Sequence, residues 1–192
     1  IFWYLGWPHP EVFSSILVFS SLVLFFDKKY YWAILLLSMA AAHFPPLFIP
    51  TAFMLIYTLF QNGISIKHLV LGGASSVFVI VPSLFYWYHF SIPNLIIHAG
   101  FISTEYITLN RLHSFFFDIN QGMIVAIPLV LLLCITLFIY RIVKLRFSIL
   151  DGLLLSVILM SYFYLQMGNW NHGMSVVNRY VVWNAMFVLF YF

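Results

Sequence analysis

Long apolar stretches, separated by polar connections, make up most of the chain. They run without the alternation of apolar and polar positions that marks a half-exposed strand, so they predict helices. Hydrocarbon cannot hydrogen-bond to the backbone, whereas a helix satisfies its own N–H and C=O groups. We therefore predict an all-α fold, a polytopic transmembrane helical bundle. The predicted segments are residues 12–26, 30–44, 47–60, 69–87, 123–140, 147–167 and 181–192.

The first three segments are short for a full crossing of the roughly 30 Å hydrocarbon core. Flanking aromatic residues, snorkelling lysines or local thinning of the bilayer would let them cross. Alternatively, Pro45, Pro46 and Pro50 divide a span into half-helices packed inside the protein. The chain starts at Ile1 without a methionine and stops inside an apolar run, so we expect a fragment that is incomplete at both ends.

The composition agrees with a membrane protein. Hydrophobic residues make up 64% of the chain and charged residues 7%, whereas soluble domains carry about 25% charged residues. The net charge of +3 arises from scattered basic residues, which do not form the basic patch of a nucleic-acid-binding protein. The single cysteine, Cys134, lies in an apolar segment, which excludes a disulfide framework and a cysteine metal site.

The basic residues indicate how the segments are oriented. If each segment crosses once, the connections alternate between the two sides, and the cytoplasmic side carries the excess of lysine and arginine. One side receives Lys28, Lys29, Lys67, Arg141, Lys144 and Arg146, and the other receives only Arg111 and Arg179. We therefore predict that residues 1–10, 43–46, 88–121 and 169–180 lie outside a bacterial or archaeal plasma membrane.

The outer connections hold most of the side chains that could bind a ligand or transfer a proton. They carry three of the acids, Glu11, Glu105 and Asp118, together with most of the histidines. We treat residues 1–192 as one transmembrane domain, in which residues 88–121 form an extracytoplasmic loop with a short interfacial helix within 92–101. The cytoplasmic connections at 27–29, 61–68 and 141–146 need no more than turn residues and basic anchors.

Motifs for metal or nucleotide chemistry are absent. The chain has no zinc-binding histidine spacing, nucleophile elbow, phosphate-binding glycine loop or dinucleotide fingerprint. No definite cofactor is indicated, and a divalent cation stays open. His43, beside two prolines, is interpreted as a structural histidine, and the small residues 72–76 as a surface for close helix packing.

The sequence Trp7-Pro8-His9-Pro10-Glu11 places an imidazole and a carboxylate together at the start of a helix. Glu11 either caps that helix, where the dipole favours an acid, or takes part with His9 in a polar site. Burying a carboxylate at membrane depth costs free energy unless the carboxylate has a function. Both interpretations of Glu11 therefore stay open.

Residues 117–122 lead into the helix that contains Pro128. Asp118 or Asn120 is a suitable N-cap for that helix. The alternative is a ligand contact made by Asn120 or Gln121.

Residues 169–180 concentrate hydrogen-bonding groups between two apolar segments. Trp170, Asn171, His172, Asn178 and Arg179 all lie within this connection. The guanidinium of arginine keeps its charge and matches a phosphate bidentately. Arg179 therefore predicts a phosphate ligand, or alternatively an internal ion pair with one of the outer acids.

Three stretches resemble the C-type (GT-C) superfamily of prokaryotic membrane glycosyltransferases, which use polyprenyl-phosphate sugars. They are residues 7–13, residues 117–122, and the Trp170…Gly173…Ser175…Asn178-Arg179-Tyr180 connection. The resemblance implies an enzyme that opens on the extracytoplasmic side and transfers a sugar from a polyprenyl-phosphate donor to a glycan, lipid or protein acceptor. It also implies a catalytic acid in an earlier outer loop, and that acid has no match from Ile1 onward. Val176 and Val177 depart from the glycine-rich pattern of the family's last loop.

The chemistry of such a transfer suits the residue types on the outer side. A positioned arginine neutralises the departing phosphate, so we expect Arg179 to contact it, with Arg111 as a second choice. Sugar hydroxyls require amides, carboxylates and aromatic platforms, which the outer residues provide. The competing hypotheses are a transporter or lipid-carrier flippase, and a non-catalytic membrane assembly subunit. Membrane lipids are expected partners and nucleic acids are not.

Overall fold

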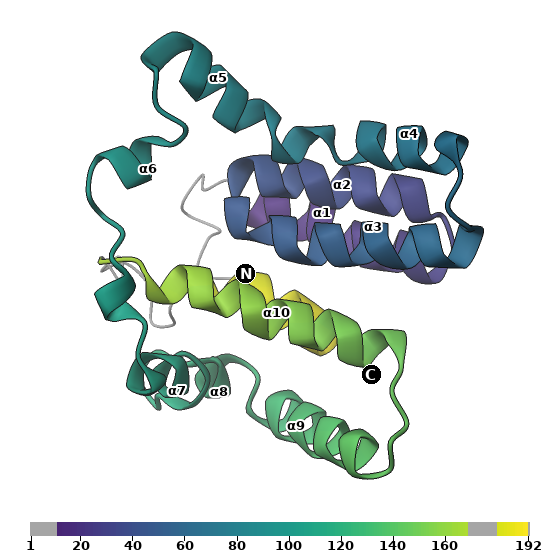
Figure 1. The fold of residues 1–192 in the computed structure, drawn as a ribbon. Coiled ribbons are helices and arrows are strands. Elements are labelled where there is room, and N and C mark those ends of the chain that lie inside the picture. Colours follow the sequence, from purple (N-terminus) through teal and green to yellow (C-terminus); the bar gives the residue numbers. More distant parts are fainter. Residues whose placement is uncertain (1–10, 169–179, 192) are drawn as a thin grey trace. The chain divides into compact units, whose positions relative to one another are not determined.

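The computed structural model describes residues 11–168 and 180–191, and its regular structure there is helical (Figure 1). One isolated antiparallel bridge joins Ile102 and Met167. The all-α prediction is confirmed. The chain divides into two compact units, Ile1–Phe101 and Ile102–Phe192, each of which is described by itself.

The first unit packs around its second helix, α2, which contacts α1, α3 and α4. Ala33, Ala40 and Ala41 of α2 are buried, and their small side chains allow close helix approach. Ser21 of α1 donates a hydrogen bond to the carbonyl oxygen of Ala33 at 2.7 Å. The elements of this unit are α1 (Glu11–Phe26), α2 (Tyr30–His43), η2 (Pro45–Leu47), α3 (Phe48–Asn62), α4 (Ile66–Ser75), η3 (Val77–Val79), α5 (Val81–Phe90) and α6 (Leu95–His98).

The predicted prolines lie at the junction of two helices. α2 ends at His43, and Pro45 and Pro46 form the short 3-10 helix η2, because proline has no N–H to continue an α-helix. Pro50 lies in the first turn of α3, where its missing N–H costs nothing. These prolines therefore interrupt the helical backbone and separate α2 from α3 (Figure 1).

The predicted continuous segment 69–87 is also interrupted. α4 ends at Ser75, and η3 intervenes before α5, whose first turn contains Pro82. The hydroxyl and the backbone N–H of Ser76 both donate to the carbonyl oxygen of Gly72, at 2.9 and 3.0 Å, and such back-bonding by serine often bends a helix. Gly72 itself lies against Leu55 of α3, so the prediction of close packing holds at this glycine.

α4 and α5 differ from the other helices because together they are long enough to cross a bilayer. Within residues 11–168 and 180–191, no individual helix is both long and apolar enough to cross a bilayer. Ile66–Ser75 and Val77–Phe90 meet both requirements only when taken as a pair, across a bend of 44°.

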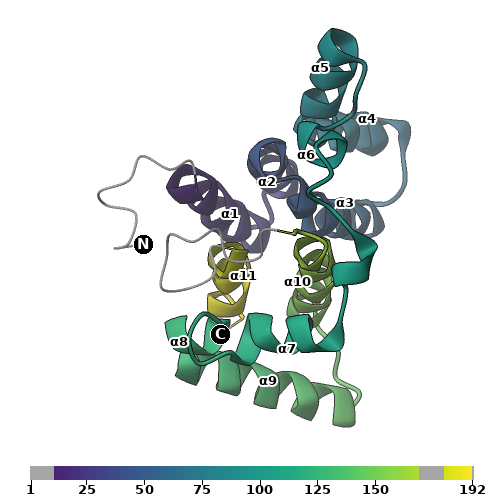
Figure 2. The ribbon, with the colours of Figure 1, turned by 90° about the vertical axis from the view of Figure 1, so that its left-hand side faces the viewer.

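The second unit is built on α10, which packs against α7 and α11, while α11 contacts α9. Figure 2 shows α10 and α11 side by side, next to α7, α8 and α9. Its largest fully buried side chains include Phe115, Met160 and Trp183. The elements are η4 (Thr104–Tyr106), α7 (Leu109–Phe117), α8 (Met123–Ala126), α9 (Pro128–Val143), α10 (Ile149–Leu165) and α11 (Tyr180–Leu189).

The predicted segment 123–140 is not one helix. It divides at Ile127, whose φ of −142° and ψ of 59° lie outside the helical region. The cause is Pro128, because its ring disfavours the α conformation of the preceding residue. α8 is therefore a single turn, and the long helix of this segment, α9, starts only at Pro128.

The first helix buries polar side chains beside Val18, Leu22 and Phe25, and exposes other apolar side chains. α1 buries Glu11, Ser14, Ser15 and Ser21. It exposes Phe13, Ile16, Phe19 and Val23, each by 45–61%. In water this distribution is unfavourable, because burying polar groups costs free energy while apolar groups gain by leaving water.

Candidate functional site

The end of the first unit at which α1 begins holds a buried acid and a serine–histidine pair. Glu11 is 3% exposed and lies in the first turn of α1, as the helix-start interpretation requires. One turn later, the Ser14 hydroxyl lies 3.0 Å from Nδ1 of His43, the last residue of α2. The hydrogen bond agrees with the structural interpretation of His43. It also places that imidazole at the same helix end as the buried carboxylate.

Arg111 fastens the start of α7 to the end of α10. Its guanidinium donates to the carbonyl oxygens of Leu165 and Met167 at 2.9 and 3.0 Å, and lies 4.5 Å above the ring of Tyr106. Carbonyls at a helix end have no partner within the helix, and a cation is favoured there. Arg111 is therefore held beside the point where the chain enters residues 169–179.

Asp118 organises the turn between α7 and α8. Its side-chain oxygen accepts hydrogen bonds from the backbone N–H groups of Asn120 and Gln121, at 2.7 and 3.3 Å. The N-cap of α8 is Gly122, so the prediction that Asp118 or Asn120 caps the following helix is wrong. An aspartate satisfies nearby N–H groups equally well in a turn. The Oε1 atom of Gln121 is buried and accepts no hydrogen bond from the described residues, which suits a ligand contact.

Gly122 is required by the tightness of this turn. A Cβ atom at this position would lie 2.6 Å from the backbone nitrogen of Asp118 and 2.8 Å from the carbonyl oxygen of Ser114. Neither atom belongs to a flexible side chain. We expect Gly122→Ala to lower the free energy of unfolding by about 1–3 kcal/mol, as other overpacking substitutions do.

Thermal unfolding of the purified protein in detergent measures this loss. Gly73→Ala is the matched control, because a Cβ there meets no atom within 4 Å and alanine is the better helix former. Equal melting temperatures for the Gly122 variant and the wild type would show that the turn relaxes without cost.

Six of the predicted site residues lie outside the residues that the structure describes, and for these the sequence interpretation stands as a prediction. They are His9, Trp170, Asn171, His172, Asn178 and Arg179. The other four, Glu11, Arg111, Asn120 and Gln121, occupy the positions given above.

A buried carboxylate in the second unit was missed by the sequence analysis. Asp151, in the first turn of α10, is 1% exposed. Its Oδ2 atom accepts hydrogen bonds from the backbone N–H and the hydroxyl of Ser148, at 2.6 and 2.8 Å. Oδ2 also lies 3.4 Å from Arg141, and the Tyr191 hydroxyl donates to Oδ1. The available signal was the S-x-x-D pattern of a capping box, which begins at Ser148.

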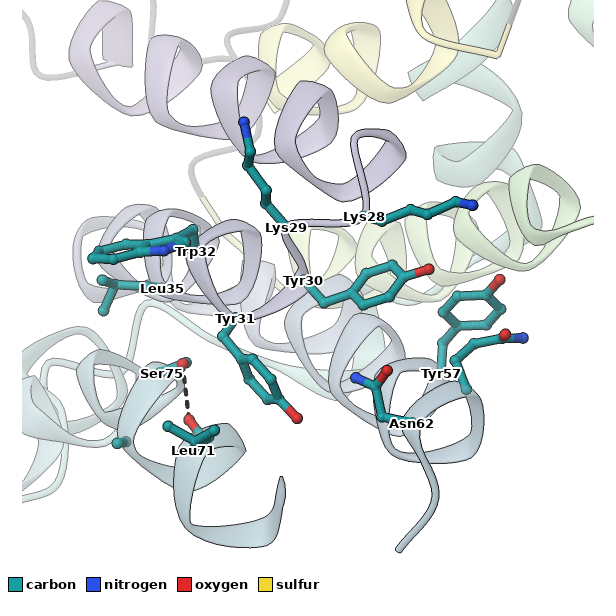
Figure 3. Close-up of a pocket in the computed structure, with 12 residues that line it drawn as sticks. Lys28, Lys29, Tyr30, Tyr31, Trp32, Leu35, Tyr57, Asn62, Leu71 and Ser75 are labelled. Atoms are coloured by element: carbon teal, nitrogen blue, oxygen red, sulfur yellow. Dashed lines mark hydrogen bonds between the residues drawn. The ribbon is translucent and has the colours of Figure 1, made fainter. Parts of the chain in front are cut away.

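In the first unit, the turn that carries Lys28 and Lys29 borders a cavity of about 970 Å³. Side chains from the α1–α2 turn, α2, the end of α3 and α4 form its walls (Figure 3). The interpretation of connections 27–29 and 61–68 as turns did not include a cavity beside them. The sequence did not show that these two connections meet.

The second unit contains an apolar cavity of about 370 Å³. It lies among α7, α9, α10 and α11, and His113 is its most polar lining residue. Its shape and lining suit a hydrocarbon group.

Metal binding has no support in the described ranges, where no group of three or more histidine, cysteine, aspartate or glutamate side chains is placed to hold an ion. Comparison with known proteins gave no match to a family model, to a curated protein or to a solved structure.

Proposed function

We propose that the chain belongs to a multi-pass membrane glycosyltransferase that moves a sugar from a polyprenyl-phosphate donor to an acceptor on the extracytoplasmic face. The observation that carries the membrane location is that α1 exposes a row of phenylalanine, isoleucine and valine side chains, while it buries serines and Glu11 together with three apolar residues. Lipid removes the cost of exposed apolar side chains and leaves the buried polar groups to pair within the protein.

The separation of polar groups along the helices supports an outer site within each unit taken by itself. In the first unit, α1 runs from buried Glu11 to the turn that carries Lys28 and Lys29. In the second, α10 runs from Asp151, beside Arg141, to the carbonyl oxygens that Arg111 holds. In each unit the predicted site residues and the basic anchors thus lie at opposite helix ends.

The proposed division of labour follows from the chemistry of the bond that breaks. The donor releases a phosphate ester, so a guanidinium contacting the phosphate stabilises the charge that develops, and Arg179 takes this role. Arg111 holds the neighbouring end of α10. The acid that accepts the proton of the attacking hydroxyl is expected before residue 1.

Sugar and carrier contacts come from other residues. Trp170 and Asn171 are proposed to supply a stacking surface and an amide for the sugar, and His9 and Glu11 an imidazole and a carboxylate. The apolar cavity among α7, α9 and α10 offers space for part of the carrier's hydrocarbon chain.

A transporter or lipid-carrier flippase is the second candidate, and the bent pair α4 and α5 favours it. Transporters bind their substrates near discontinuous helices, and these two helices meet at a 44° bend. Transport without transfer would move the carrier between leaflets and leave its sugar attached. The product analysis below therefore distinguishes the two candidates.

Membranes that contain the full-length protein should transfer radiolabelled sugar from a polyprenyl-phosphate donor to acceptor material, and membranes that lack it should not. Sealed right-side-out vesicles should use donor supplied from outside. Carrier that crosses the membrane with its sugar intact would instead identify the flippase.

Sidedness is tested separately by cysteine labelling in a Cys134→Ala background. We expect an impermeant maleimide added to right-side-out vesicles to label Asn171→Cys and to leave Lys144→Cys unmodified. Labelling both positions from the same side would contradict the proposed single outer site.

A further inference from the structure

The cavity at the lysine-bearing end of the first unit has no role in the proposed transfer. Its volume of about 970 Å³ lies at the upper end of the range for small-molecule sites. Its lining residues are Lys28, Lys29, Tyr30, Tyr31, Trp32, Leu35, Tyr57, Gln61, Asn62, Leu71, Ala74 and Ser75. Two cations and no carboxylate belong to this set, so the cavity suits an anion.

The two lysines differ in their surroundings. Lys29 pairs with Asp27 at 2.7 Å, and both side chains are more than half exposed. Lys28 makes no ion pair or hydrogen bond through its side chain within the described part of the chain. Its backbone has a φ of 60°, a conformation that costs free energy for any residue but glycine or asparagine. Lys28 thus occupies a position of the turn at which glycine would adopt the same backbone conformation without strain.

Neutral polar groups extend to the same side of the cavity as Lys28. In Figure 3, Lys28 and the hydroxyl groups of Tyr30 and Tyr57 extend to the same side, with Asn62 nearby. Phe25 fixes both tyrosine rings, with centroids at 5.3 and 5.5 Å from its own. The polar ends of the two tyrosines and of Asn62 make no hydrogen bond to other described residues, so they can donate to a ligand.

The rest of the lining is apolar and open to the surroundings. Trp32 is 64% exposed, and Leu35 and Leu71 complete this wall (Figure 3). Donors and a cation at one end, and an indole and leucines at the other, match a molecule with an anionic head and a hydrocarbon body. A free phosphate would contact only the end of the cavity that holds the hydrogen-bond donors and the cation.

We propose that this cavity binds the phosphate group of an anionic membrane phospholipid, with Lys28 as its main charged contact. The proposal uses the membrane location argued above and goes beyond the sugar transfer. Basic sites between helices on the cytoplasmic side commonly hold anionic headgroups. Lys28 and Lys29 lie on the side that the charge distribution assigns to the cytoplasm.

The test measures lipid binding to the purified full-length protein in detergent by native mass spectrometry, with phosphatidylglycerol and phosphatidylcholine as probes. We expect the wild type to prefer phosphatidylglycerol and Lys28→Gln to bind it roughly fivefold more weakly. Lys28→Gly should lose binding equally, and because glycine accepts the positive φ it keeps the turn intact. Lys28→Arg should retain binding.

Lys67→Gln is the matched control, since this lysine lies on the same side of the same unit and does not line the cavity. A loss of binding in Lys67→Gln as large as in Lys28→Gln would overturn the proposal, as would equal affinity for both lipids. Glycerol phosphate that binds as tightly as phosphatidylglycerol would identify a soluble anion in place of the lipid.

Salt dependence provides a test on the unaltered protein. The preference for phosphatidylglycerol should fall as sodium chloride rises, because exposed charges are screened. A preference that does not change with salt would exclude the role of Lys28. Sugar transfer should be unchanged in Lys28→Gln, so a failure of lipid binding and a failure of the transferase proposal are distinguishable.

Discussion

Asp151→Ala is expected to lower the free energy of unfolding by about 3–5 kcal/mol, because it removes a buried carboxylate together with its hydrogen bonds and its partly buried ion pair. The carboxylate of Asp151 joins three helices, because it accepts from Ser148 at the start of α10, from Arg141 of α9 and from Tyr191 after α11. Its loss leaves a buried hydroxyl, a helix-start N–H and a partly buried guanidinium without their acceptor. Denaturant unfolding of the purified protein in detergent, followed by tryptophan fluorescence, measures the change.

Two further variants show whether burial is the cause. Asp27→Ala removes a carboxylate that is 58% exposed and pairs with Lys29, and it should cost less than about 1 kcal/mol. Asp151→Asn keeps one acceptor oxygen and should fall between the two alanine variants. If Asp151→Ala and Asp27→Ala unfold alike, the interactions around Asp151 do not hold the second unit together.

Arg179→Ala in the full-length protein is expected to reduce sugar transfer by roughly 10²–10³-fold, the usual effect of removing one preorganised donor from a developing anion. Arginine cannot lose its proton, and its guanidinium forms two parallel hydrogen bonds to a phosphate. The measurement is the initial rate of transfer from a polyprenyl-phosphate donor in membranes with equal amounts of folded protein.

Lysine should restore only part of the rate, because it keeps the charge and loses the bidentate geometry. Arg146→Ala, on the opposite predicted side, is the matched control and should transfer at the wild-type rate. Unchanged transfer in Arg179→Ala would remove this residue from the mechanism. An equal loss in Arg146→Ala would point to folding or insertion in place of phosphate binding.

Helix positions were the most predictable property of the chain. Every predicted apolar segment contains helix, and α1, α2 and α10 begin or end within a few residues of the predicted limits. Long apolar runs in a sequence predict helices with mostly apolar side chains directly. The errors fall at Ile127, where the following proline disfavours the helical backbone, and at residues 76–80, where the Ser76 hydroxyl bonds back to the carbonyl oxygen of Gly72.

Contacts between distant residues were the least predictable. Glu11 and Gln121 were candidates on sequence grounds, and burial supports their interest. Asp151 was overlooked, since its role depends on Arg141 and Tyr191 meeting it from other helices. The lysine-lined cavity was equally inaccessible, because no sequence pattern states that the α1–α2 turn lies beside the end of α3.

α10 is held in place by charged hydrogen bonds at both of its ends. Asp151 fastens the first turn to the neighbouring helices, and Arg111 holds the carbonyl oxygens of Leu165 and Met167 at the other end. A helix tied at both termini can neither slide along its axis nor unwind from one end without breaking charged hydrogen bonds. Both ends of α10 should therefore resist fraying.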